Sequence, residues 1–182
     1  MTIVFREDKA TQAAAYLLHC SGGKMNHMKL IKLLYLADRT ALIKWGRPIT
    51  FDWYVSMPHG PVPSFTLDLI NSQPDPGSKS YWHEYISERK GHKVSLKKAK
   101  PNDQLSPAEE QILKEVFDEY GQLSQWDLRD TTHRLPEWKD PKGSSHPISI
   151  REILLAGGYS EEDVDEIEDA LEAEASAIRL LE

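Results

Sequence analysis

The feature that most restricts the fold is one long apolar helix, which the sequence predicts between residues 26 and 46. Asn26 can cap its amino end, and Gly46 stands just beyond its last turn, where helices commonly terminate. Apolar residues recur near the helical period between these ends: Met28, Ile31, Leu34, Tyr35, Leu42 and Ile43. A helix with this much apolar surface must bury it against other elements, so we expect it to be the central core helix.

Further helices are predicted from their end signals. Residues 9–20 carry apolar residues at helical spacing and stop at Ser21-Gly22-Gly23. Four later starts resemble capping boxes, in which a serine bonds a free amide and an acid three residues on bonds back. The four pairs are Ser106 with Glu109, Ser124 with Asp127, Ser149 with Glu152, and Ser160 with Asp163. These helices should end near Gly121, Pro136, Gly157 and the C-terminus, so most of the second half is expected to be helical.

Two segments predict strands instead. In "SYWHEYISERKGHKVSLKK", aromatic and β-branched residues alternate with polar ones on both sides of Lys90-Gly91, which is typical of a hairpin with strands of about five residues. The segment "TFDWYVS", residues 50–56, predicts a third short strand with Phe51, Trp53 and Val55 on one side. The expected fold is therefore mainly α: a compact multi-helix single domain over residues 1–182 with a small antiparallel β element.

The stretch "VSMPHGPVPS", residues 55–64, cannot be helical throughout. Proline fixes φ and lacks a donor, and the residues before the three prolines are pushed toward extended conformations. We expect a rigid corner that turns the chain sharply and starts a helix over residues 62–71, with Pro63 in its first turn.

Charge is distributed unevenly along the chain. Residues 160–182 hold ten acidic residues and one basic residue, a net charge of −9, while the whole chain carries −7. Apolar residues at spacings of three and four should pack one stripe of this acidic helix against the domain: Val164, Ile167, Leu171, Ala175, Ile178 and Leu181. Six basic residues lie between Arg89 and Lys100. An acidic chain with one short basic ribbon argues against direct nucleic-acid binding.

Several functional classes lack their sequence signals. The lone cysteine, Cys20, cannot form an internal disulfide, and no signal segment is seen, so a cytoplasmic location is expected. No apolar run approaches the roughly 20 residues of a membrane span. The seven histidines have no close partner at metal-ligand spacing, and the phosphate-loop, dinucleotide, zinc-protease and hydrolase motifs are missing. We expect no metal and no cofactor, although an enzyme with scattered catalytic residues stays an alternative.

Three blocks in a fixed order are more specific than any of these signals. They are "MNHMKLIKLLYLADRTALIKWGRPIT", "FDWYVSMPHGPVP" and, about 60 residues later, "LSQWDLRDTTHRLPEW". Together they resemble the Panacea domain, the SocA-like antitoxin domain of bacterial and phage toxin–antitoxin pairs, over about residues 8–157. The residues that carry the resemblance are Lys29, Lys32, Leu33, Tyr35, Gly46-Arg47-Pro48, His59-Gly60-Pro61-Val62, Leu128, His133, Pro136 and Trp138. His59 stands where the family commonly has an aromatic residue.

The resemblance implies a non-enzymatic antitoxin that silences a genetically linked toxin by direct protein binding. It implies no catalytic residue. A second mechanism known in the family is that of a proteolytic adaptor, which delivers its toxin to a Clp protease. Two functions of a different kind also stay open for such a chain: a phage-derived regulator that binds a host protein, and an unrecognised enzyme.

Candidate partner-binding residues fall into three groups, each with a structural alternative. The rigid corner offers Tyr54, Met57 and His59, or it only builds a turn. The long helix offers Lys29, Lys32 and Arg39, or these cations are solvated or ion-paired. The acidic helix offers Glu162, Glu166 and Asp169 to a basic toxin, or its face only confers solubility. Residues expected to serve the fold are Gly46, Pro48, Gly60, Pro61, Trp126, His133 and Trp138, with both tryptophans in the core.

Overall fold

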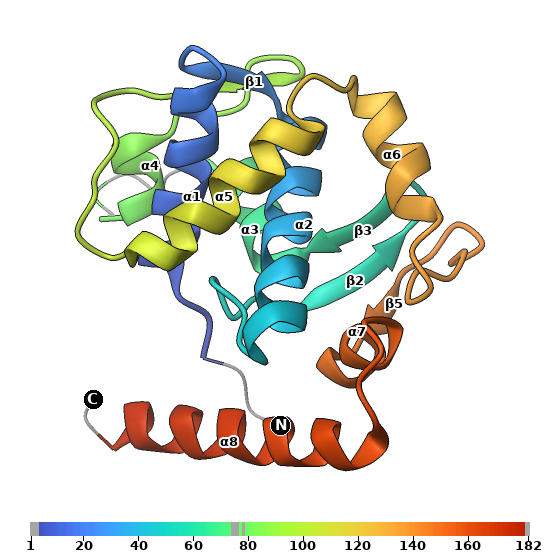
Figure 1. The fold of residues 1–182 in the computed structure, drawn as a ribbon. Coiled ribbons are helices and arrows are strands. Elements are labelled where there is room, and N and C mark those ends of the chain that lie inside the picture. The colour runs from blue at the N-terminus through green and yellow to red at the C-terminus, as the bar shows by residue number, and fades with distance from the viewer. Residues whose placement is uncertain (1–3, 74–76, 78, 181–182) are drawn as a thin grey trace.

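The structure is a computed structural model that describes residues 4–73, 77 and 79–180. Helix α2 (His27–Trp45) runs through the middle of the molecule (Figure 1). The helices that contact it include α1 (Glu7–Cys20), α5 (Pro107–Tyr120), α6 (Gln125–His133) and α7 (Ile150–Ala156). The prediction of a central core helix is therefore confirmed.

Both ends of α2 are fixed as the sequence predicts. The Asn26 side chain accepts a hydrogen bond of 2.9 Å from the amide of Met28. Gly46 adopts the left-handed conformation with φ 69°, and its amide donates to the carbonyl of Leu42 at 2.8 Å. Left-handed backbone costs glycine little because glycine has no Cβ, so the helix ends sharply here.

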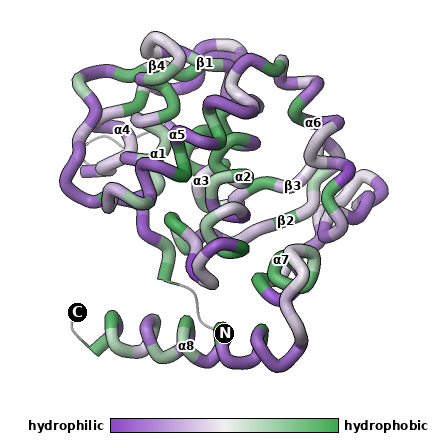
Figure 2. The backbone as a smooth tube through the Cα atoms, in the orientation of Figure 1, coloured by the Kyte–Doolittle hydropathy of each residue, from purple (hydrophilic) through white to green (hydrophobic). Residues whose placement is uncertain are grey.

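Two hydrophobic clusters lie on the two sides of α2. The first joins α1, α2 and α5 through buried residues that include Leu17, Leu33 and Leu113. The second gathers Tyr35 and Leu42 with side chains from the sheet, α7 and α8 (Glu161–Arg179). Figure 2 shows the hydrophobic residues along α2 and the alternation of hydrophobic and hydrophilic residues along α8.

Two small antiparallel sheets complete the fold, which is mainly helical with a minor β element as expected. One has the strand order β3–β2–β5, built from β3 (Gly60–Pro63), β2 (Tyr54–Met57) and β5 (His146–Ile148). The other pairs β1 (Lys24–Asn26) with β4 (Lys93–Ser95). Because both sheets join distant segments of the chain, they fix the helices relative to one another.

The proline-rich corner is a strand and not the start of a helix, contrary to expectation. Residues 60–63 pair with β2 in a register that places Met57 opposite Gly60, so Pro58 and His59 form a two-residue turn. Strand β3 lies at the sheet edge, where proline's missing amide leaves no ladder bond unmade. Helix α3 (Ser64–Asn71) begins only after Pro63.

The predicted hairpin around Lys90-Gly91 is only partly present. The prediction of its first strand is wrong, since Tyr81–Tyr85 forms the short helix α4. Trp82 and Ile86, four residues apart, are both fully buried, and this helical spacing prevailed over the apparent alternation. The turn itself exists: the amide of Lys90 donates to the carbonyl of Lys93 at 2.9 Å, and Gly91 has φ 62°.

The strand predicted over residues 50–56 starts only at Tyr54, and its buried side chains are those of Tyr54 and Ser56. Tyr54 and Ser56 are 2% and 1% exposed, whereas Trp53 is 44% exposed. Phe51 has φ 54°, which lies outside the range of an extended strand. The side of the strand that carries Phe51 and Trp53 is therefore not the one that points inward.

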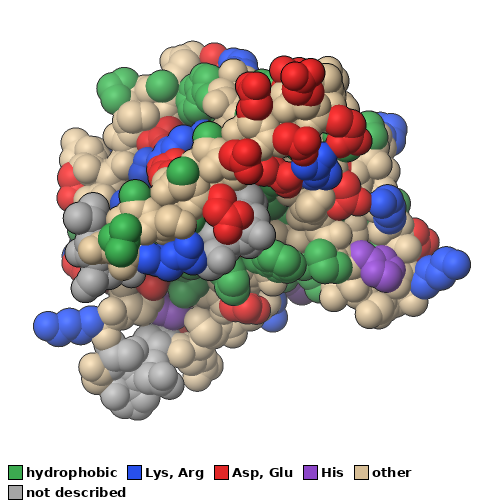
Figure 3. Space-filling view, turned by 90° about the horizontal axis from the view of Figure 1, so that it is seen from below, with side chains coloured by type: hydrophobic (Ala, Val, Ile, Leu, Met, Phe, Trp, Pro, Cys, Tyr) green, Lys and Arg blue, Asp and Glu red, His purple; other side chains and the backbone are tan. Residues whose placement is uncertain are grey.

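All four predicted capping boxes are present, at the starts of α5, α6, α7 and α8. Along α8, Val164, Leu171 and Ala175 are buried, and Ile167 and Ile178 are half-buried. Leu181 lies outside the described residues. Acidic side chains gather on the face that includes α8 (Figure 3). Among the residues described, no helix combines the length and hydrophobicity that crossing a membrane requires.

Candidate functional site

The most specific sequence motifs come together around one glycine at the start of β3. Lys32 of α2 is 1% exposed, and its Nζ donates to the carbonyl of Pro61 at 2.8 Å. A Cβ added to Gly60 would lie 2.7 Å from Oγ1 of Thr132 and 2.9 Å from Nζ of Lys32. Gly60 also has φ 97°. Both steric space and backbone conformation therefore require glycine here.

Lys32 is neither solvated nor ion-paired, contrary to the sequence interpretation. Its side chain is enclosed between α2, β3 and α6, and burial lowers the pKa of its amine to about 7. Low-polarity surroundings disfavour the charged form of an amine. The residue therefore connects α2 to the strand and does not present a cation to a partner.

His133 and Trp138 complete this motif cluster. Their rings stack with centroids 4.0 Å apart and an interplanar angle of 10°. The indole Nε1 of Trp138 donates to the carbonyl of Met57 at 3.1 Å, which holds the end of β2. Nε2 of His133 is buried without a hydrogen-bond partner, and burial, assisted by nearby Lys32, lowers the pKa of the imidazole.

A buried carboxylate, Asp38, fixes the segment between α2 and β2. It accepts hydrogen bonds from the amides of Ile49 and Thr50 at 2.9 and 3.0 Å, and from the hydroxyl of Tyr54 at 2.9 Å. Pro48 of the same segment is buried. Tyr54 is thus a core residue bound to Asp38, and the expectation that it faces a partner is wrong.

The other two basic candidates on α2 are held by intramolecular contacts. Arg39 forms an ion pair with Glu137, with Nε and Oε1 2.6 Å apart, so its ion-paired interpretation is confirmed. The hydroxyl of Tyr35 donates to the same carboxylate at 2.9 Å. Lys29 donates to the carbonyl of Gly121 at 2.5 Å and is half-buried.

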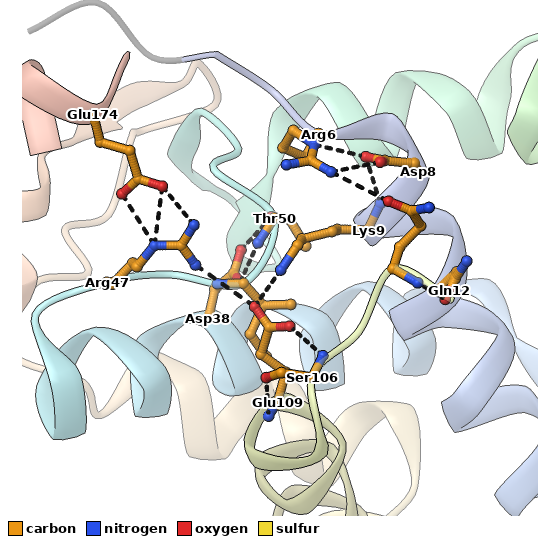
Figure 4. A network of polar contacts seen from close by, with 12 residues as sticks. Arg6, Asp8, Lys9, Gln12, Asp38, Arg47, Thr50, Ser106, Glu109 and Glu174 are labelled. Carbon is orange, nitrogen blue, oxygen red and sulfur yellow. Dashed lines mark hydrogen bonds and ion pairs between the residues drawn. The ribbon is translucent and has the colours of Figure 1, made fainter. Parts of the chain in front are cut away.

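Arg47 links α8 to the domain (Figure 4). Its guanidinium lies 2.6 Å from a carboxylate oxygen of Glu174 on α8 and 3.7 Å from Glu109 on α5. Glu109 also accepts from Nζ of Lys9 on α1 at 2.5 Å. Arg47 therefore joins α5 to α8 directly, and Glu109 extends the connection to α1.

An apolar pocket opens beside the β2–β3 turn. Its volume is about 140 Å³, and its lining residues include His27, Met28, Ile31, Met57, Val62 and Leu67. Lys32 and the turn residues Pro58 and His59 also line it. Pro58 and His59 are exposed, whereas Met57 is half-buried. Of the three residues expected at the corner, the structure thus places Met57 and His59 at one accessible site.

Trp126 lies at the surface next to this turn and not in the core. Its side chain is 48% exposed, and its ring meets the His59 ring edge-on, with centroids 6.3 Å apart. The guanidinium of Arg129 lies over the indole, 5.2 Å from its centroid. Trp126 is the second residue of α6 and is exposed, and Trp138 is half-buried.

The acidic candidates form a separate surface. Glu162, Glu166 and Asp169 are all exposed on α8. Figure 1 shows α8 along the lower side of the molecule, whereas the β2–β3 turn lies beside α6. The two groups of candidates therefore do not form one site.

Sequence reasoning missed the buried acids that organise this region: Asp38, Asp52 and Glu137. Asp38 did leave a signal, because it falls at a core position of the long helix between Ala37 and Ala41, and a buried carboxylate requires donors. Their donors come from other segments and could not be identified. Within the described part of the chain, no group of three His, Cys, Asp or Glu side chains is arranged to hold a metal ion.

Comparison with protein families identifies this arrangement. The family described as "Antitoxin SocA-like, Panacea domain" matches residues 30–139, which is more than half of the chain. This segment begins inside α2 and ends one residue after Trp138, and it contains every residue of the Gly60 motif cluster. Comparisons with curated proteins and with solved structures gave no match. The match assigns the chain a role in a toxin–antitoxin system, and the protein belongs to the Panacea domain family of SocA-like antitoxins.

Proposed function

We propose that the protein neutralises a cognate toxin, encoded by an adjacent gene, through direct stoichiometric binding. The match to the antitoxin family over residues 30–139 is the observation that carries this proposal. A family of antitoxins also favours a non-enzymatic role. Neutralisation then requires a binding surface. On that surface, the free energy gained from contacts with the toxin must exceed the free energy lost in ordering the two proteins.

The surface around the β2–β3 turn is the best candidate for that contact. It offers Trp126 and His59 as exposed rings, next to an apolar pocket. Tryptophan is enriched among residues that dominate binding energy at protein interfaces. The turn is already held from below by Trp138 and Lys32, so little conformational entropy is lost when a partner binds.

Toxin neutralisation can be tested in cells and with purified proteins. Expression of the adjacent gene alone should arrest growth, and co-expression of this protein should restore it. The purified pair should form a complex of fixed stoichiometry in size-exclusion chromatography. Failure of the two purified proteins to associate, despite rescue in cells, would contradict direct binding.

A host strain that lacks the Clp protease distinguishes direct binding from the proteolytic adaptor mechanism. If the protein acts by binding, rescue persists in a host that lacks the Clp protease, and the toxin level stays constant. Under the adaptor mechanism, rescue is lost in that host, and the toxin disappears only where the protease is present. Toxin immunoblots before and after induction distinguish the two.

A further inference from the structure

The geometry points to one kind of toxin segment: we propose that the pocket beside the β2–β3 turn holds a single apolar side chain of the toxin, flanked in the toxin by acidic residues. This inference rests on the proposed function of direct toxin binding. It adds the place of the contact and the chemistry of the segment that is bound.

The size of the pocket selects its occupant. Sites for small-molecule ligands usually measure about 300–1,000 Å³. This pocket has a volume of about 140 Å³ and walls made mainly of Met28, Ile31, Met57, Val62 and Leu67. That space suits one aliphatic or aromatic side chain. A buried apolar anchor of this kind is what commonly provides most of the binding energy at a protein interface.

The walls are held in place before any partner arrives. The carbonyl of Met57 accepts from Trp138, and Lys32 fixes the neighbouring strand through Pro61. Ile31 and Val62 are 2% and 4% exposed and belong to the main core cluster. An entering side chain therefore meets a formed pocket and does not have to order one.

The charged groups around the pocket set the preferred flanking chemistry. Arg89 lies 3.3 Å from the His27 ring that lines the pocket, and it donates to the side chain of Asn71 at 2.9 Å. Both of these partners of Arg89 lack a negative charge. The amide of His27 donates to the carbonyl of His92 at 2.8 Å, which brings the turn with exposed Lys90 to the same edge. The basic ribbon of the sequence therefore begins at the border of this pocket.

The opposite border is also cationic but partly neutralised. Arg129 lies over Trp126 and is paired with Asp130, with Nη2 and Oδ1 2.7 Å apart. Asp68, the residue after Leu67 on α3, is an exposed acid three residues before Asn71. Within the described part of the chain Arg89 and Lys90 form no ion pair, and with exposed Lys93 they outnumber the exposed acid of the same turn, Glu88. This net positive charge attracts carboxylates and disfavours basic flanks.

Binding of the purified product of the adjacent gene tests the pocket directly. Met28→Glu places a carboxylate at the pocket wall, and Arg89→Glu reverses the charge at its border. Met28 is half-buried and lies outside the core clusters, so the fold should persist, and melting temperatures check this. Each variant should raise Kd at least ten-fold. The matched controls Leu155→Glu on α7 and Arg179→Glu on α8, both at exposed positions, should stay within two-fold.

A photo-crosslinking amino acid at position 28 tests the chemistry of the toxin segment. The crosslinked segment should contain an apolar residue with Asp or Glu within two or three positions. Wild-type binding by both pocket variants, or a crosslinked segment flanked by Lys or Arg, would overturn the pocket assignment and leave the proposed function standing. If the wild-type proteins do not associate at all, the proposed function and this inference both fail.

Discussion

Nζ of Lys32 donates to the carbonyl of Pro61 across 2.8 Å, and this hydrogen bond links the central helix α2 to the edge strand β3. Pro61 is one of two prolines in β3, a strand whose prolines contribute no amide to the ladder. The side chain of Lys32 therefore adds a contact to an edge strand whose ladder partner is β2. The site next to the turn depends on a buried amine that the sequence suggested would be exposed.

Burial of Lys32 predicts that the protein becomes more stable as the pH rises above neutrality. The pKa of Lys32 is about 7 in the folded state and about 10.4 in an unfolded chain. Between these values the unfolded state binds more protons, so stability increases with pH, by at most about 1.4 kcal/mol per pH unit. Below pH 7 both states carry the proton, and the full penalty of burying the charge applies.

Urea unfolding at pH 7, 8 and 9 measures this effect. The free energy of unfolding of the wild type should rise relative to that of Lys32→Met, whose buried side chain no longer titrates. Lys24→Met, which alters an exposed lysine of β1, should follow the wild type. Parallel pH profiles for the wild type and Lys32→Met would contradict a depressed pKa for Lys32.

Gly60→Ala should destabilise the fold more than Gly22→Ala, although both glycines have left-handed backbone conformations. Gly60 (φ 97°) and Gly22 (φ 80°) both have positive φ, but only at Gly60 would a Cβ meet atoms, at 2.7 Å from Thr132. Gly22→Ala should therefore report the backbone strain alone, about 1–3 kcal/mol, and Gly60→Ala should cost about 1–3 kcal/mol more. Chemical denaturation compares them. Equal losses would mean that the cluster around Gly60 yields to the added methyl group.

Asp52→Asn should weaken the start of α3. The carboxylate of Asp52 accepts from the amides of Phe65 and Thr66 at 2.8 and 2.9 Å, and from the hydroxyl of Thr66 at 2.6 Å. Pro63, at the N-cap position, makes no side-chain cap bond, so Asp52 performs this role from another segment. Replacing one acceptor oxygen by an amide donor should cost about 1–2 kcal/mol of stability.

The control for Asp52 lies on the same helix. Asp68 is exposed, and Asp68→Asn should change the melting temperature little. Comparable losses of stability in the two variants would indicate a general charge effect on α3 and would contradict the capping role of Asp52.

Local signals in the sequence predicted the helices, whereas the strands and the site depended on distant partners. The caps at Asn26 and Ser106 are formed by side chains within three residues of the amides they bind, so they could be read directly. Strand β4 pairs with β1, about 70 residues away, and no local pattern records that choice. Lys32 looked like a surface cation for the same reason, since its acceptor, Pro61, lies in another element.

Neutralising the acidic face of α8 distinguishes the two candidate surfaces. Glu162 and Glu166 are four residues apart, and Asp169 follows three residues later, so like charges lie next to one another on the exposed face. Each such pair destabilises a helix by about 0.2–0.5 kcal/mol. Replacing the three residues with Gln, Gln and Asn should therefore leave the melting temperature unchanged or slightly higher.

Because the proposed contact is at the β2–β3 turn, the association rate with the toxin should stay within two-fold. If the toxin instead binds α8 through a basic surface, the rate should fall several-fold, and the salt dependence of association should weaken with it. Stopped-flow association at two ionic strengths decides between these outcomes, and a several-fold decrease would assign the acidic helix to the interface.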